Sequence, residues 1–187
     1  MITDFLGVYV QKNNINKKLL PLTLSFSIII LDQISKLWIT NNVPYGTIYA
    51  SFFGDFLRIV HVTNLGAAFG IGNDLLGAWR FISLCIIPLV ILLIVLIAFF
   101  VTKEFSQTQR WFISGILGGG FGNLIDRFFR PNGVVDFIDI KFYGLFGLER
   151  WPTFNIADAA VLICEIGLVI SFLFSVPFSS AEKNDAK

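Results

Sequence analysis

Charged residues are scarce in this chain of 187 residues: they make up 14% of the sequence, against about a quarter in an ordinary soluble protein. Neither sign dominates, since 14 Lys and Arg face 13 Asp and Glu, whereas a protein with a nucleic-acid partner would carry a basic surplus. Hydrophobic residues reach 55% and the mean hydropathy is +0.75, which excludes a disordered chain. We therefore expect an integral membrane protein that forms a single domain over residues 1–187.

Histidine and cysteine are also rare. His61 is the only histidine, so the sequence lacks the residues for a Ser-His-Asp triad, a Cys-His pair or a zinc peptidase site. Cys85 and Cys164 fall in apolar stretches, where they are expected to pack as small apolar residues rather than to form a disulfide framework. The sequence also has no phosphate-binding glycine loop.

Four long apolar stretches dominate the sequence instead. Each approaches the roughly 20 residues needed to cross a bilayer core, and helix is the expected form because lipid cannot hydrogen-bond an open sheet edge. The expected membrane spans are 19–39, 81–101, 111–129 and 156–176. Lys and Arg near the span ends favour one side by seven to five, and Lys17 and Lys18 directly precede the first span. Because positive residues gather on the cytoplasmic side, we expect both termini there.

The two outward segments, 40–80 and 130–155, have different patterns. Residues 40–80 place β-branched and aromatic residues between glycines, which predicts short strands and a turn. Residues 130–155 are apolar enough to rest on the membrane surface, with Tyr143 and Trp151 as interfacial anchors. The expected fold is therefore a membrane all-α core of four transmembrane helices, a small extracytoplasmic β-rich cradle, and an interfacial loop or helix.

The first span carries two opposite charges. A charge in the middle of a membrane helix costs about 2.5–3.5 kcal/mol and is a functional candidate for that reason. Asp32 lies four residues before Lys36, so the two share a helix face and can pair. A self-neutralising pair near the outer end of the helix is the alternative explanation.

Glycines and polar residues share one face of the third span. At steps of four residues, this face presents Gly115, Gly119, Asn123 and Arg127. Small residues allow another helix to approach closely. Helix packing with an arginine that reaches the interface explains the glycines but not the Asn–Arg pair. Asp126 lies about 100° away around the helix and either joins Arg127 or faces water.

Aspartates flank the third and fourth spans at their outward ends. Asp136 follows the third span, and Asp158 opens the fourth, three residues after Asn155. Because one helix ends and the next begins on the same side, the two carboxyl groups lie at the same depth and can meet. Such a pair shares one proton: the ionised partner takes a proton from water, and the protonated partner donates to a carbonyl. Alternatively, Asp158 caps its helix and Asp136 is solvated. The roles of Asp139 and Glu165 stay open.

Five blocks of this sequence, in order, resemble the lipoprotein signal peptidases (signal peptidase II), the aspartyl proteases of the bacterial inner membrane. The blocks are DQISK (32–36), NLGAAFG (64–70), GNLIDR (122–127), VVDFID (134–139) and FNIADAA (154–160). Each block alone is weak evidence, but five blocks with compatible spacing and a four-span layout form a specific resemblance. The first 15 residues and the C-terminal tail match nothing particular.

The resemblance implies cleavage of diacylglyceryl-modified prolipoproteins just before the lipidated cysteine, with no metal or cofactor. Asp136 and Asp158 would be the catalytic pair. The residues that line the site and hold the substrate or the pair would be Asn64, Asn123, Arg127 and Asn155. Structural support would come from Asp32, Lys36, Gly115 and Gly119. The protein would work as a monomer among membrane lipids, with its active site near the outer face of the inner membrane.

Two other functions use the same residues. A small proton-coupled transporter subunit could employ Asp32, Lys36, Asp158 and Glu165 as a relay, although transporters keep such acids near the middle of the membrane. A prepilin-type aspartyl protease would keep the chemistry of the pair but would need its acids on the cytoplasmic side. A reporter fused after Phe129 distinguishes the two protease topologies.

Overall fold

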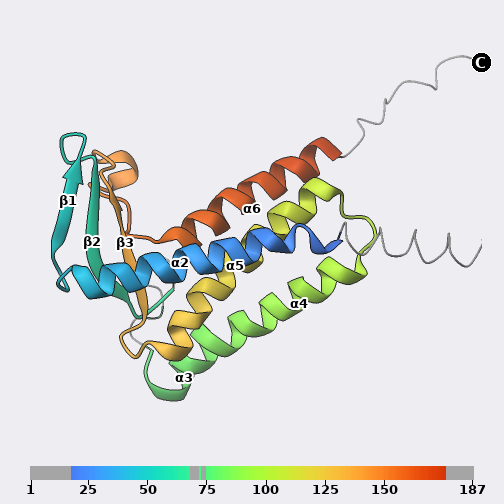
Figure 1. The fold of residues 1–187 in the computed structure, drawn as a ribbon, viewed down its shortest axis with the longest axis horizontal. Coiled ribbons are helices and arrows are strands. Elements are labelled where there is room, and N and C mark those ends of the chain that lie inside the picture. Colours follow the sequence, from blue (N-terminus) through green and yellow to red (C-terminus); the bar gives the residue numbers. More distant parts are fainter. Residues whose placement is uncertain (1–17, 68–71, 73–74, 176–187) are drawn as a thin grey trace, which may run out of the picture.

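The computed structural model describes residues 18–67, 72 and 75–175, which form a bundle of helices with a small sheet at one end (Figure 1). Pro88 lies at the start of α4 and cannot donate a backbone hydrogen bond to the preceding turn, which accounts for a π-helical turn there. The helical elements are α2 (Leu22–Asn42), α3 (Gly77–Phe81), the π-helical turn Ile82–Ile86, α4 (Ile87–Val101), α5 (Gln107–Phe129) and α6 (Ile156–Ser175).

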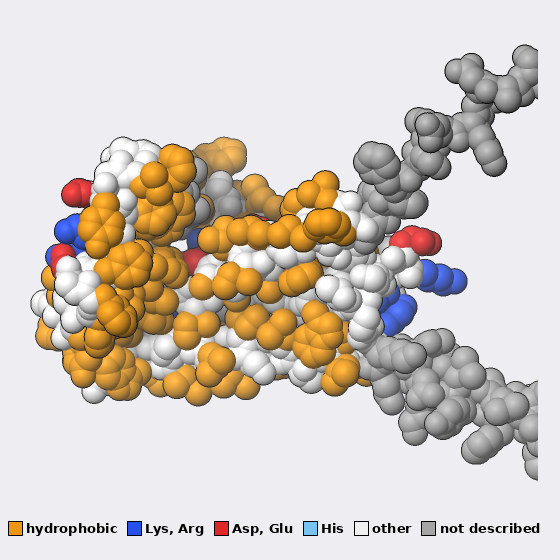
Figure 2. All heavy atoms as spheres, turned by 90° about the horizontal axis from the view of Figure 1, so that it is seen from above, with side chains coloured by type: hydrophobic (Ala, Val, Ile, Leu, Met, Phe, Trp, Pro, Cys, Tyr) orange, Lys and Arg blue, Asp and Glu red, His pale blue; other side chains and the backbone are white. Residues whose placement is uncertain are grey.

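Within the part of the chain that the structure describes, three helices are long and apolar enough to cross a membrane: α2, the continuous helix Gly77–Val101, and α6. They coincide with three of the predicted spans. Their outer surfaces are apolar, as Figure 2 shows along the length of the bundle, and side chains such as Ile94, Ile97 and Ile163 are at least 60% exposed. An apolar surface of this extent is suited to lipid rather than to water.

The fourth predicted span is α5, the most polar and glycine-rich of the long helices. It begins at a capping box in which Ser106 Oγ accepts from the Gln109 backbone N–H at 3.2 Å, and the Gln109 side chain accepts from the Ser106 N–H at 2.9 Å. From there α5 runs between its neighbours and packs against α2, α4 and α6 (Figure 1). Most of its polar face is therefore enclosed by protein.

Glycines allow these close contacts. A Cβ atom at Gly115 would overlap the Cys164 sulfur of α6, and one at Gly119 would overlap the Ala157 carbonyl oxygen. On the other side of α5, a Cβ at Gly118 would lie 2.8 Å from a Cα atom of α2. The prediction that the small residues admit neighbouring helices is confirmed for both Gly115 and Gly119.

The sheet consists of β1 (Ile48–Phe52), β2 (Leu57–Asn64) and β3 (Val134–Ile140), all antiparallel, in the order β1-β2-β3. The prediction of short strands within residues 40–80 is confirmed. Asp136 stands opposite Val62 of β2, beyond a register irregularity in the β2–β3 pairing.

The prediction of a loop or helix at 130–155 is wrong for residues 134–140, which form β3, and only Leu145–Gly147 makes a short 3₁₀ turn. The reason is the unpaired edge of β2, whose backbone groups need partners. Val135 and Phe137 pack on Ile39 and Val43 at the end of α2. Since side chains alternate along a strand, Asp136 points to the opposite side.

The ends of the described chain lie together. Leu22 and Ser175 belong to the end of the bundle that is farthest from the sheet, whereas α2 ends, α5 ends and α6 begins beside the sheet (Figure 1). Residues from all three helices can therefore meet β3 at one place.

Candidate active site

Asp136 on β3 and Asp158 in the first turn of α6 bind the same asparagine. The Asn155 side-chain amide donates to Asp136 Oδ1 at 2.7 Å, and the Asn155 backbone N–H donates to Asp158 Oδ2 at 3.2 Å. In return, the Asp158 N–H donates to Asn155 Oδ1 at 2.9 Å, which closes a reciprocal cap at the start of α6. Asp158 therefore caps α6, as one of the two sequence explanations expects, and it shares Asn155 with Asp136, the other member of the predicted carboxyl pair.

Asn123 of α5 links this pair to the interior. Its side-chain NH₂ donates to Asp158 Oδ1 at 2.6 Å. Its Oδ1 accepts from Lys36 Nζ at 2.9 Å and from the Asn155 amide at 3.1 Å. Because the ammonium of Lys36 can only donate, the orientation of the Asn123 amide is fixed, and its NH₂ must face Asp158.

Lys36 is fully buried among carboxylates. Its Nζ lies 2.7 Å from Asp32 Oδ2, as the sequence predicted, and 3.0 Å from Asp126 Oδ2. Asp32 also accepts the Ala157 backbone N–H at 3.0 Å, so α2 holds the first turn of α6. Charges buried this deeply are tolerated only when they are paired and hydrogen-bonded, as they are here.

The sequence allows Asp126 either to join Arg127 or to face water, and the structure shows a different arrangement. Its carboxylate binds Lys36, accepts from Arg130 Nε at 3.0 Å, and accepts the Val135 backbone N–H at 3.2 Å. Asp126 therefore fixes the strand at the residue before Asp136. The spacing of four between Asp126 and Arg130 was the available sequence signal for this pair.

Arg127 and Asn64 lie at the loop that follows β2. Arg127 donates to the Gly66 carbonyl at 3.2 Å, and its Nε is buried with no hydrogen-bond partner among the described residues. Asn64 accepts the Gly66 N–H at 2.9 Å and donates to the Ala67 carbonyl at 3.2 Å. Both side chains thus hold the loop at the edge of the site.

Burial raises the pKa of the Asp136 carboxyl from 3.8 to about 7, and the neighbouring carboxylate of Asp158 adds to the rise. Hydrogen bonds from Asn155 and Asn64 and the charge of Lys36 act in the opposite direction. A carboxyl with this pKa holds a proton for much of the time at neutral pH.

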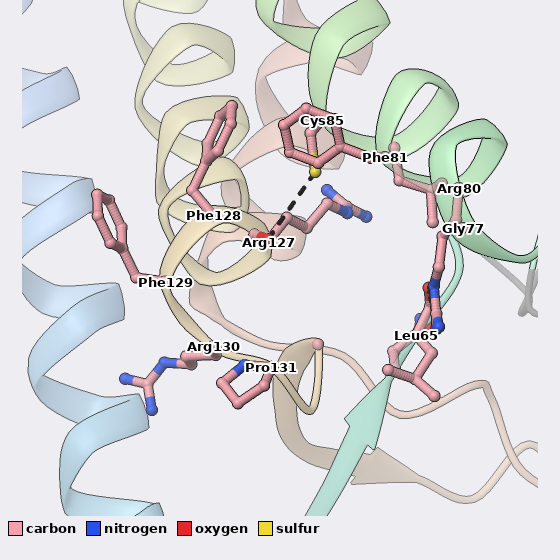
Figure 3. Close-up of a pocket in the computed structure, with 13 residues that line it drawn as sticks. Leu65, Gly77, Arg80, Phe81, Cys85, Arg127, Phe128, Phe129, Arg130 and Pro131 are labelled. Atoms are coloured by element: carbon pink, nitrogen blue, oxygen red, sulfur yellow. Dashed lines mark hydrogen bonds between the residues drawn. The ribbon is translucent and has the colours of Figure 1, made fainter.

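A cavity of about 330 Å³ borders the site, and Figure 3 shows it between α5, the α3–α4 helix and the end of β2. Arg127 extends into it from α5, and the Cys85 thiol donates to the Arg127 carbonyl at 3.8 Å. Arg80 binds the Leu65 carbonyl at 3.0 Å on the opposite wall. The remaining lining is largely apolar and includes Phe81, Leu84, Phe128 and Phe129. This cavity suits a ligand with a polar backbone and an apolar remainder.

The family model described as "Signal peptidase (SPase) II" matches residues 24–174. The chain belongs to the signal peptidase II family. It is 52% identical over 157 residues to the lipoprotein signal peptidase of Treponema pallidum (strain Nichols), with 84% of both chains covered. It is 44% identical to that of Treponema denticola over 161 residues, which cover 86% of this chain and 92% of the relative.

Two solved structures have the same fold. Both are described as bacterial membrane enzymes determined by the in meso method, at 2.3 Å and 1.9 Å resolution, and they share 30% and 31% identity with this chain. Their TM-scores are 0.71 and 0.68, and the alignments cover 89% and 83% of this chain and 94% of each of theirs.

As a signal peptidase II, the chain is an aspartic-type peptidase of the bacterial inner membrane that removes signal peptides from prolipoproteins. Family membership favours this function over the transporter alternative. Within the signal peptidase II fold, the remaining acidic candidates lie elsewhere. Asp139 binds Arg150 Nε at 2.6 Å and 2.8 Å near the far end of the sheet, where Arg150 also reaches Asp55. Glu165 is exposed on the outer surface of α6.

Proposed function

We propose that this signal peptidase II cuts diacylglyceryl-modified prolipoproteins immediately before the lipidated cysteine, with Asp136 and Asp158 as its catalytic residues and without a metal or cofactor. The observation that carries the proposal is the hydrogen bonding of both carboxyl groups to Asn155, together with the raised pKa of Asp136. Two carboxyl groups that differ in protonation are what hydrolysis by an activated water requires.

The surroundings of the two acids support different roles for them. Asp158 accepts hydrogen bonds on both oxygens, from Asn123 and from the Asn155 backbone. Asp158 therefore acts as the base that removes a proton from water. Asp136, whose pKa is raised to about 7, holds the proton that it donates to the scissile carbonyl oxygen.

The reaction then balances without a covalent enzyme intermediate. The water oxygen bonds to the carbonyl carbon, its proton passes to Asp158, and the carbonyl oxygen receives the proton of Asp136. When the C–N bond breaks, the leaving amine of the cysteine takes the proton from Asp158, and Asp136 recovers a proton from the tetrahedral intermediate. Both acids end in their starting states.

The neighbouring residues support this chemistry. Asn123 and Asn155 orient the pair, while Arg127 and Asn64 hold the substrate backbone beside the loop after β2. Arg127 is suited to this role because its buried Nε has an unused donor. The structural support comes from Asp32, Lys36, Gly115 and Gly119.

We further propose that α5 is a fourth membrane span, that both termini are cytoplasmic, and that the sheet and the catalytic pair lie at the outer face. In support, α5 runs alongside three apolar helices, and the sheet lies at the end opposite Leu22 and Ser175. A substrate anchored by its own acyl chains stays in the bilayer, so a peptidase that cuts next to the anchor needs its acids at the interface. The protein acts as one domain over 1–187 and as a monomer surrounded by lipid.

The test is cleavage of a diacylglyceryl-modified prolipoprotein by purified protein in detergent. Asp136→Asn and Asp158→Asn keep the side-chain volume and remove the titratable group, and both are expected to be folded and inactive. The matched control is Glu165→Gln, which alters an exposed acid of α6 and should cleave like wild type. Near-full activity of either aspartate variant, or a trapped covalent peptidyl-enzyme, contradicts the proposal.

A further inference from the structure

A second cavity, also of about 330 Å³, lies beside the outer end of α2. It shares the turn from Phe129 to Gly133 with the cavity of Figure 3 but is otherwise lined by different elements. Its hydrogen-bonding side chains come from α2, β2, the chain between α2 and β1, and the α5–β3 turn, and they are Thr40, Tyr45, His61, Thr63, Arg130 and Asn132. No function described above uses this cavity.

The cavity offers a cation without a lining carboxylate. Arg130 donates a hydrogen bond from Nε to Asp126, but the two terminal nitrogens of its guanidinium have no hydrogen-bond partner among the described residues. Figure 3 shows this guanidinium directed away from Arg127 and toward α2. Neither Asp nor Glu occurs among the residues that line the cavity. Such a site favours an anion with several oxygen acceptors.

The other polar groups suit a hydroxylated molecule. His61 Nδ1 lies 2.7 Å from the Val43 carbonyl oxygen, which can only accept, so Nδ1 carries the proton. With the proton on Nδ1, Nε2 is the ring nitrogen that can accept a hydrogen bond from a hydroxyl group. The Tyr45 ring packs edge-on against His61 at 5.6 Å and fixes its orientation.

An apolar strip leads from this cavity along the bundle. Phe129, which lines the cavity, is 81% exposed. Leu37 and Ile30 are more than half exposed. Both precede Thr40 of the cavity on α2, at spacings that place them on one face of the helix. A molecule with a polar head in the cavity would therefore have apolar surface for its hydrocarbon portion.

We propose that the cavity beside α2 binds the phosphate headgroup of an anionic membrane lipid, with Arg130 as the cation and the lipid chains along Leu37 and Ile30. The proposal rests on the four-span arrangement proposed above, which puts the ends of α2 and α5 at the level of the outer headgroups. Charge complementarity and the adjoining apolar strip distinguish a lipid from a soluble anion as the occupant.

Native mass spectrometry of the full-length protein in detergent measures this binding directly, with phosphatidylglycerol and phosphatidylcholine as the two probes. The wild type is expected to bind one phosphatidylglycerol about tenfold more tightly than phosphatidylcholine. Both lipids carry the phosphate, but the trimethylammonium group of phosphatidylcholine is repelled by the Arg130 cation and has no hydroxyl group to donate to His61. Arg130→Gln should abolish the preference. Because that variant also loses a partner of Asp126, Asn132→Asp serves as a second test: it adds a repelling carboxylate at an exposed residue of the turn.

Arg80→Gln is the matched control, because Arg80 lines only the other cavity and should leave the preference unchanged. The proposal is overturned if Arg80→Gln loses the preference as Arg130→Gln does, if Asn132→Asp keeps it, or if wild type binds both lipids equally. Displacement of the lipid by an equal concentration of inorganic phosphate would assign the site to a soluble anion instead. Prolipoprotein cleavage by Asn132→Asp, measured separately, distinguishes failure of this inference from failure of the proposed function.

Discussion

Replacing Asp136 by asparagine should make the protein more stable at alkaline pH while abolishing catalysis. Asp136 has a pKa of about 7 in the folded protein and 3.8 as an ordinary aspartate. Each pH unit between those values is worth about 1.4 kcal/mol, so at pH 8 the folded wild type bears a cost of about 4 kcal/mol from ionising this group. Asparagine carries no such cost.

The direction in which the free energy of unfolding changes with pH follows from proton binding by the folded and unfolded states. Between the two pKa values the folded state holds a proton that the unfolded state has released, so stability falls as pH rises through about 7. At pH 5 the cost is about 1–2 kcal/mol. The free energy of unfolding of wild type relative to Asp136→Asn should therefore drop by about 2–3 kcal/mol between pH 5 and pH 8.

Equilibrium unfolding of both proteins in mixed detergent micelles at pH 5, 6, 7 and 8 measures this difference, and titrating groups that do not interact with Asp136 cancel in the comparison. Asp55→Asn is the flat control, because the Arg58 guanidinium holds the pKa of Asp55 below its ordinary value of 3.8, so this group is ionised in both the folded and the unfolded state from pH 5 to pH 8. For that pair the difference in unfolding free energy should stay constant over this range, since the advantage of the wild type is lost only as pH falls below the ordinary aspartate pKa. A difference between wild type and Asp136→Asn that stays flat from pH 5 to pH 8 would refute the reasoning.

Three further predictions concern rate and packing. The kcat/KM of cleavage should fall as pH rises past about 7, where Asp136 loses its proton, and a rate that is flat to pH 9 would contradict this. Lys36→Met leaves two buried carboxylates without their ammonium partner and should lower the free energy of unfolding in micelles by about 3–5 kcal/mol. The control Lys141→Met removes a partly exposed lysine and should lower it by less than about 1 kcal/mol. Gly119→Ala puts a methyl group against a backbone carbonyl of α6 and should lower the same free energy by about 1–3 kcal/mol. Gly120→Ala meets only a flexible side-chain end and should cost less.

The sequence predicted the helices and the two acids because these depend on local composition and on chain direction. Four apolar stretches mark the positions of α2, α4, α5 and α6 to within a few residues. Topology alone predicts that Asp136 and Asp158 lie at the same depth, since Asp136 follows the end of the third span and Asp158 lies at the start of the fourth. The Asp32–Lys36 pair followed from a spacing of four.

The parts that the sequence did not predict depend on contacts between distant segments. VVDFIDI is apolar on both sides, so its pattern is that of an interfacial segment as much as of a strand, and only the free edge of β2 decides between them. Asp126 points toward α2 because α5 packs against α2 with this side of the helix facing it. No residue spacing within α5 specifies how the helix is rotated about its axis. The cavity beside α2 likewise arises from segments far apart in the chain.

The buried charges also bear on how the protein enters its membrane during synthesis. Lys36 pairs with Asp32 on α2, and Arg130 pairs with Asp126 across the end of α5, each at a spacing of four. In each helix, the basic residue therefore has an acidic partner on the same segment. As a result, α2 can enter the bilayer as a net-neutral segment before α5 has been translated. During assembly Lys36 keeps Asp32 and gains Asp126 as a second partner, so no isolated charge has to be neutralised for the first time in lipid.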